Sequence, residues 1–212
     1  MEDFPIILHS MAIDNLNIPI DEIVRYACMG QPTLNNEDRD ILYNGATNAA
    51  KQLKKVITCR GVYRCFPVLD VSNGTANLGF ATVNSKHLIN HIEGCSHIIL
   101  MAVTLGVGVD RIISKKSATS AGEGFLFSCA GSAAAEAYID SMCEELIEKF
   151  DTKGYNLTER FSAGYGDFSI SYQNDILRAL NAPKNIGLTL SEGYLMIPTK
   201  SITAVVGVHS KR

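Results

Sequence analysis

The chain has 212 residues, of which 46% are hydrophobic, and it carries a formal net charge of -3 with a pI near 5.9. This length and composition are sufficient to bury a sizeable core, and they favour one globular domain over residues 1–212. Proteins that bind nucleic acid need a basic patch or stripe, and the charge balance provides none. We therefore expect no nucleic-acid partner.

The N-terminal residues, the longest apolar run and the cysteines together indicate where in the cell the protein is located. Residues 1–5 open acidic and lack the basic region and apolar run of a secretory signal. The apolar run 98–109 is interrupted by Gly106 and Gly108 and is too short to span a bilayer. Six cysteines are scattered without any Cys-x-x-Cys pair, which favours reduced thiols over a zinc site. The sequence predicts a cytoplasmic protein with no membrane partner and no metal.

The first half of the chain predicts two helices and a hairpin. Residues 18–28 have a proline and acids in the first turn of a short helix that ends at Gly30, and residues 36–54 have the apolar periodicity of a second helix. Residues 56–71 are rich in β-branched and aromatic side chains and predict a strand. Ser72-Asn73-Gly74 would form a tight turn, with residues 77–82 as the returning strand.

Helix and strand signals continue in the middle of the chain. Ser85 is suited to cap a helix up to Ile92, and the apolar residues 97–105 predict a buried strand. Residues 119–150 predict one long helix, with a first half rich in small residues and an amphipathic second half. In that second half four acids recur every fourth residue: Glu136, Asp140, Glu144 and Glu148. Such a stripe is also typical of a solvated helix face.

The remaining elements set the fold class. After Gly154 a loop precedes a helix at 171–180, and two strands are expected at 186–190 and 201–208. Helices and strands are interspersed without regular alternation, which predicts an α+β domain with a largely antiparallel sheet. Gly106 and Gly108 follow a strand and precede a helix, but the third glycine of a Rossmann fingerprint is missing. A turn is the favoured interpretation of that segment.

A short loop sequence carries the strongest functional signal. It reads Arg160-Phe161-Ser162-Ala163-Gly164-Tyr165-Gly166-Asp167. Two glycines suit an irregular loop that brings bare backbone against a ligand, and the arginine can bind a carboxylate with two parallel hydrogen bonds. Taken alone, the same residues also suit a structural turn with a surface arginine.

The positions around this loop resemble a known family. Arg160, Gly164 and Tyr165 are followed by Thr189, Glu192, Met196, Pro198, Ser201 and Thr203. This order is similar to that of the C-terminal activation domain of vitamin B12-dependent methionine synthase, and the similarity covers residues 120–208. The resemblance implies a C-shaped α+β domain with a twisted antiparallel sheet, flanking helices and one long helix.

The resemblance also implies a ligand and its site. The family domain binds S-adenosylmethionine, and the matching positions here are Arg160, Ser162, Ala163, Gly164, Tyr165 and Glu136. Arg160 would bind the ligand's carboxylate, Glu136 would lie near its ammonium group, and Tyr165 would stand beside the reacting centre as the catalytic residue. Phe161-Ser162-Ala163 replaces a Pro-Ala-Pro pattern of the family, and a tyrosine beyond the last family strand has no counterpart here.

The activity implied by the resemblance is reductive reactivation. The family domain delivers the methyl group of S-adenosylmethionine to the cobalamin of methionine synthase after that cobalamin has been oxidised. A low-potential reductant such as flavodoxin supplies the electron. The five histidines include no Asp-x-His-x-x-Gly motif, so cobalamin would be present only through a corrinoid-binding partner. The alternative is a module that docks on a corrinoid protein and either no longer binds S-adenosylmethionine or binds another ligand.

Overall fold

The structure is a computed structural model that describes residues 4–29, 35–72 and 74–211. Its elements, in chain order, are β1 (Ile7–Ser10), η1 (Ile13–Asn15), α1 (Ile20–Ala27), α2 (Asn36–Lys54), β2 (Arg60–Pro67), β3 (Asp70–Ser72), β4 (Thr75–Asn77), β5 (Thr82–Val83), α3 (Lys86–His91), β6 (His97–Thr104), α4 (Val107–Thr119), α5 (Ala121–Asp151), β7 (Tyr155–Leu157), η2 (Ile170–Tyr172), α6 (Gln173–Ala179), α7 (Ala182–Ile186), β8 (Thr189–Leu190), β9 (Met196–Ile197) and β10 (Ser201–Ser210). Among the described residues, no helix is both long enough and apolar enough to cross a membrane.

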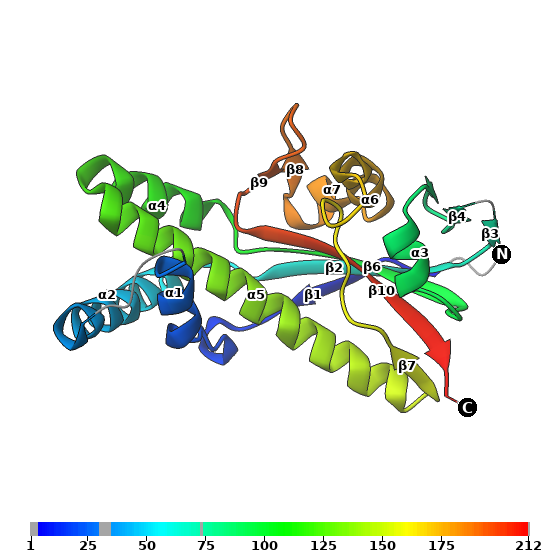
Figure 1. Cartoon of the computed structure of the whole chain (residues 1–212), viewed down its shortest axis with the longest axis horizontal. Helices are drawn as coiled ribbons and strands as arrows, with labels where there is room; N and C mark the ends of the chain where they lie inside the picture. The colour runs from blue at the N-terminus through cyan, green and yellow to red at the C-terminus, as the bar shows by residue number, and fades with distance from the viewer. Residues whose placement is uncertain (1–3, 30–34, 73, 212) are drawn as a thin grey trace.

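A five-stranded antiparallel sheet forms the centre of the molecule (Figure 1). Its strand order is β1-β2-β6-β10-β7, and β6 pairs along its whole length with β2 on one side and β10 on the other. A central strand covered on both faces is apolar at successive positions, which explains the unbroken hydrophobic run of β6. The predicted α+β class with an antiparallel sheet is confirmed, and the antiparallel pairing excludes a Rossmann fold.

The two faces of the sheet carry two separate cores. Ile99, Met101 and Val103 of β6 pack under α1, α2 and α5, whereas the alternating side chains of the same strand pack under α3, α6 and α7. This division follows from the two-residue side-chain period of a strand. Figure 1 shows α5 running along one face and α6 and α7 covering the other.

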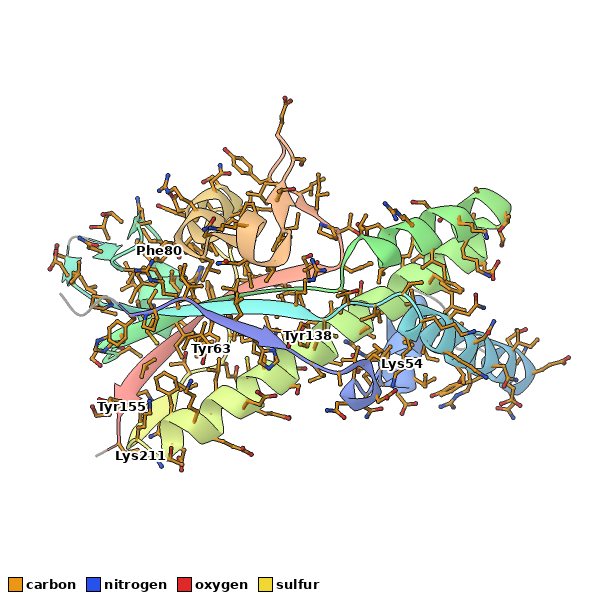
Figure 2. The ribbon with its side chains drawn as sticks, turned by 180° about the vertical axis from the view of Figure 1, so that it is seen from behind. Lys54, Tyr63, Phe80, Tyr138, Tyr155 and Lys211 are labelled. Carbon is orange, nitrogen blue, oxygen red and sulfur yellow. The ribbon has the colours of Figure 1, made fainter. Side chains whose placement is uncertain are left out.

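Helix α5 is the long helix that the sequence predicted. Ser120 caps its start by accepting a hydrogen bond from the Glu123 N–H, and its small-residue first half lies against α1, α2 and α4. Farther along, Tyr138 is fully buried, and Figure 2 shows it in the layer between α5 and the sheet. Its hydroxyl lies 3.0 Å from Nδ1 of His9 on β1. Helix α5 therefore holds the edge strand β1 in place as well as covering the sheet.

The predicted hairpin of residues 56–71 and 77–82 is wrong in its pairing. Strand β2 pairs with β1 and β6, while β3, β4 and β5 form a separate three-stranded sheet. The turn itself lies where it was expected, because Ser72 pairs with Thr75; Asn73 is outside the described residues. The apolar strand β2 finds larger apolar neighbours in β1 and β6 than the short polar segment after the turn provides.

Several element boundaries also differ from the prediction. Strands β1, β7 and β9 and helix α7 were not predicted, whereas α4 is the helix expected after the strand and its two glycines. The strand expected at 186–190 is reduced to β8 because α7 occupies residues up to Ile186. Gly187, at φ 72°, ends that helix. Helix α1 ends at Ala27, and the predicted stop at Gly30 lies outside the described residues. Helix α2 has the predicted bounds.

Close packing of α4 on α5 gives a testable prediction. A Cβ placed on Gly124 would lie 2.0 Å from Ser117 Oγ and 2.6 Å from its Cα, whereas a Cβ on Gly122 would meet nothing within 4 Å. Gly124→Ala is therefore expected to lower the free energy of unfolding by about 1–3 kcal/mol, the usual cost of overpacking. Gly122→Ala, in the same helix turn, should leave it unchanged or raise it by up to about 1 kcal/mol. Urea denaturation of both variants measures the difference, and equal stabilities would contradict the packing argument.

Candidate functional site

A cavity of about 640 Å³ lies between the second half of α5, the strand β10 and the segment that connects β7 to α6. That connecting segment crosses β10 in Figure 1, where it is coloured yellow. Cavities of roughly 300–1,000 Å³ are typical of small-molecule sites. The size and the mixed polar and apolar lining therefore suit a ligand larger than a simple amino acid.

Most of the residues predicted from the sequence meet at this cavity. The predicted residues that line it are Glu136, Arg160, Ser162, Ala163 and Tyr165. Gly164 lies between two of them in the same loop and does not itself line the cavity. Met196, Ser201 and Thr203 of the family pattern line it as well, whereas Glu192 is exposed in the turn between β8 and β9.

Arg160 forms a charged cluster with two acids of α5. Its Nη2 donates to Glu136 Oε2 at 3.1 Å and to Asp140 Oδ1 at 2.6 Å, and its Nη1 donates to Glu136 Oε2 at 3.2 Å. The two acids are four residues apart, so they lie on one helix face. Part of the acidic stripe is thus an ion-pair surface rather than only a solvated face. Sequence reasoning did not assign Asp140 to the site, although its spacing from Glu136 was a usable signal.

The loop after Arg160 begins as a strand partner and then turns away. Phe161 exchanges two backbone hydrogen bonds with Val205 of β10, at 2.9 and 2.8 Å. Gly164 at φ 102° and Gly166 at φ 56° then adopt backbone conformations that side chains disfavour, which the sequence predicted. Tyr165 is consequently placed at the cavity rim with 69% of its surface exposed.

Asp167 anchors this loop to the start of α3. Its carboxylate accepts from Ser85 Oγ at 2.5 Å, from the Lys86 N–H at 2.8 Å and from the His87 N–H at 3.2 Å. The Ser85 hydrogen bond and these backbone donors lower the pKa of Asp167 to about 2. A side chain on Gly166 would displace the His87 imidazole, since a Cβ would lie 2.5 Å from His87 Nδ1. The position of Tyr165 thus depends on a contact with a distant helix.

The Asp167 anchor predicts a pH dependence of stability. Because the pKa of the folded state is depressed from 3.8, the anchor stabilises the protein fully above about pH 4 and loses this effect as the pH falls toward about 2. The difference in unfolding free energy between the native chain and Asp167→Asn should therefore shrink as the pH is lowered through this range. Chemical denaturation at several pH values measures it. A difference that stays constant would show that the carboxylate charge has no part in the anchor.

The inner wall of the cavity combines apolar side chains with buried polar ones. Leu146, Leu157 and Val206 contribute apolar surface, and burial raises the pKa of the Cys143 thiol to about 11. Gln173, the first residue of α6, is only 4% exposed and accepts a hydrogen bond from Thr203 Oγ1 at 2.8 Å. Nothing in the local sequence marked Gln173, because its neighbour in the site is 30 residues away.

The segment from β9 to β10 is fixed by its own polar contacts. Ser201 Oγ donates to the Pro198 carbonyl at 2.7 Å, and the Thr199 N–H donates to Asp110 Oδ2 at 3.0 Å. Asp110 belongs to α4, which begins after Gly106 at φ 82°. The Gly106–Asp110 segment is therefore a strand-to-helix turn, as favoured from the sequence. Within the described part of the chain, no group of three or more His, Cys, Asp or Glu residues is arranged to hold a metal ion.

Comparison with known proteins adds a structural relative. No protein-family model matches the chain, and the search of curated proteins finds no match. A solved structure described as the crystal structure of the MetH reactivation domain bound to AdoHcy is similar, with a TM-score of 0.71 and 16% sequence identity. The match covers 100% of this chain and 80% of that chain. The chain therefore has the fold of the MetH reactivation domain.

Proposed function

We propose that this protein binds S-adenosylmethionine in the cavity and presents its methyl group to a corrinoid cofactor held by a partner protein. The partner would be a cobalamin-dependent methionine synthase or a related corrinoid methyltransferase in need of reactivation. The observation that carries the proposal is the meeting of Glu136, Arg160 and Tyr165 at one cavity. The solved relative supports it, because that domain holds S-adenosylhomocysteine, the demethylated form of the same molecule.

The charged cluster is suited to the amino-acid end of this ligand. A zwitterion carries a carboxylate and an ammonium group, and the cluster carries a guanidinium with two carboxylates. The ligand's carboxylate can take the place of one acid on Arg160, and its ammonium group can pair with the acid that is displaced. Glu136 and Asp140 are 44% and 57% exposed, so solvent screens them and this exchange has a small cost.

Tyr165 and the loop backbone would orient the sulfonium. An aromatic face attracts a cation, and Tyr165 stands at the rim, where a partner's cofactor has access. The corrinoid supplies the nucleophile that accepts the methyl group, and a low-potential reductant such as flavodoxin supplies the electron. This chain's own contribution is to bind the donor, align it and exclude water. No side chain of the cavity is required to act as acid or base.

Calorimetric titration with S-adenosylmethionine tests the proposal. We expect saturable binding to the native chain with one site per chain, and competition by S-adenosylhomocysteine. Adenosine triphosphate, which shares the nucleoside but lacks the amino acid, is the control ligand and should not compete. Absence of any S-adenosylmethionine binding would overturn the proposed function.

A second candidate is a docking module that has lost this ligand. One observation favours it: the Arg160 guanidinium is already satisfied by Glu136 and Asp140. The same titration separates the two candidates, because the docking module would bind a corrinoid protein while ignoring S-adenosylmethionine. Sedimentation of the chain with a cobalamin-loaded methionine synthase, with and without S-adenosylmethionine, distinguishes ligand-independent docking from ligand-dependent docking.

A further inference from the structure

The cavity contains a neutral polar pair on the opposite side of the sheet from the charged cluster. Gln173 and Thr203 are 4% and 1% exposed, and Thr203 Oγ1 donates to Gln173 Oε1 at 2.8 Å. The Thr203 side chain lies on the same face of β10 as that of Val205, which belongs to the core under α6. The Ala204 side chain lies on the other face and belongs to the core under α5. The pair therefore lies on the α6 face, while Arg160 meets α5.

The side-chain NH₂ group of Gln173 is a hydrogen-bond donor directed to the cavity. Its oxygen accepts from Thr203, so its NH₂ group carries the remaining hydrogen-bonding capacity. Among the described residues this NH₂ group has no hydrogen-bond partner. Every described side-chain nitrogen or oxygen that is shielded from solvent does have a hydrogen-bond partner, so the Gln173 nitrogen is not one of the shielded atoms. The nitrogen must therefore reach accessible space, and the accessible space next to Gln173 is the cavity. A nearly buried donor held in one orientation is a typical recognition element.

The backbone of Thr203 adds hydrogen-bonding groups at the same place. The Lys200 carbonyl accepts a hydrogen bond from the Leu105 N–H, which lies on the β6 side of β10. Val205 forms both of its backbone hydrogen bonds with Phe161, on the opposite side. Backbone groups alternate sides along an antiparallel strand, so those of Thr203 point the same way as those of Val205. The loop leaves β10 after Phe161, with a single isolated bridge there. The Thr203 N–H and C=O consequently point away from β6, toward the side of β10 that borders the cavity.

Resting on the proposed function, we infer that Gln173 and the Thr203 edge bind the purine base of the ligand, with the Gln173 NH₂ group donating to a ring nitrogen. The ligand then passes along the edge of β10 that borders the cavity, with its charged amino-acid end at Arg160 and its neutral base at Gln173. Phe161, the neighbour of Arg160, pairs with Val205. Val205 is two residues from Thr203, so the two ends of the proposed site are separated by about 7 Å along the strand. A base presents ring-nitrogen acceptors and an exocyclic amino donor, which match an amide donor and a backbone carbonyl.

The test is a binding cycle with S-adenosylhomocysteine and its 1-deaza, 3-deaza and 7-deaza analogues, each lacking one ring nitrogen. Gln173→Leu, which keeps the side-chain volume, should weaken S-adenosylhomocysteine binding about tenfold, the effect of one net hydrogen bond. One of the three analogues should bind the native chain about tenfold more weakly than S-adenosylhomocysteine does. That analogue should bind Gln173→Leu with the same affinity as it binds the native chain, because the analogue and the substitution remove the same hydrogen bond. Gln52→Leu, on α2 and away from the cavity, is the matched control and should bind as the native chain does.

A second measurement uses the native chain alone, in case the buried substitution prevents folding. In ¹⁵N-labelled protein the side-chain amide signal of Gln173 should shift when S-adenosylhomocysteine is added, and should shift less with the analogue that binds weakly. Binding of S-adenosylhomocysteine with no such shift, or with additive losses for all three analogues, would overturn this inference and leave the proposed function intact. No binding of S-adenosylhomocysteine or S-adenosylmethionine to the native chain would overturn both.

Discussion

Arg160→Ala is expected to weaken S-adenosylmethionine binding by about 1.5–3 kcal/mol, or roughly 10- to 150-fold, the scale of a hydrogen bond to a charged group. The substitution removes the only cation among the described residues that line the cavity, and it leaves Glu136 and Asp140 without this partner. The ligand's carboxylate would then face two carboxylates. Calorimetry of the variant against the native chain measures the loss.

Two further variants show whether this loss belongs to the site. Arg178→Ala removes an exposed arginine that pairs with Asp175 on α6 and does not line the cavity, so it should leave affinity unchanged. Glu136→Gln keeps the size of the side chain and removes one charge, so it should weaken binding less than Arg160→Ala. An Arg160→Ala variant that binds as tightly as the native chain would remove Arg160 from the site. An unaffected Glu136→Gln variant would show that this acid is only a surface partner of Arg160.

The second large effect concerns methyl transfer, which should require three components together. The isolated protein with S-adenosylmethionine should methylate no small thiol, because the proposed nucleophile belongs to the partner's corrinoid. Transfer should begin when a corrinoid-loaded partner and a low-potential reductant are both present. The visible spectrum of the partner's cobalamin reports the change from the oxidised form to the methylated form. Methylation of substrates by the protein alone would contradict the proposal, as would a failure of every corrinoid partner to respond.

Tyr165→Ala should slow this spectral change in the complete system. Tyr165 is exposed at the cavity rim, so its removal should cost little stability while withdrawing the aromatic face that steadies the sulfonium. Tyr194, in the turn between β8 and β9, does not line the cavity, and Tyr194→Ala serves as the matched control with an expected native rate. Equal rates in the two variants would remove Tyr165 from the reaction.

Local sequence signals were sufficient for the elements that depend on their own residues. Helix α2 has the bounds that its apolar period predicted, and α5 starts at a serine cap and keeps its amphipathic second half. The strand β6 follows its unbroken apolar run. The loop at 160–167 was identified because its residues, together with those that follow, resemble the activation domain of vitamin B12-dependent methionine synthase. The fold class followed from the order of helices and strands.

Contacts between distant segments were decided only by the tertiary structure. Strand β2 pairs with β1 and β6 rather than with the segment after its own turn, since pairing depends on which apolar surfaces meet and not on proximity in the chain. The ion pairs of Arg160 join residues 24 and 20 positions apart, and the Asp167 anchor spans about 80. Gln173 was recognised as a candidate ligand-binding residue only because α6 places it against Thr203. Composition and periodicity specify which residues are buried and in what local conformation, whereas a site built from several elements depends on how their faces pack, which no short stretch of sequence encodes.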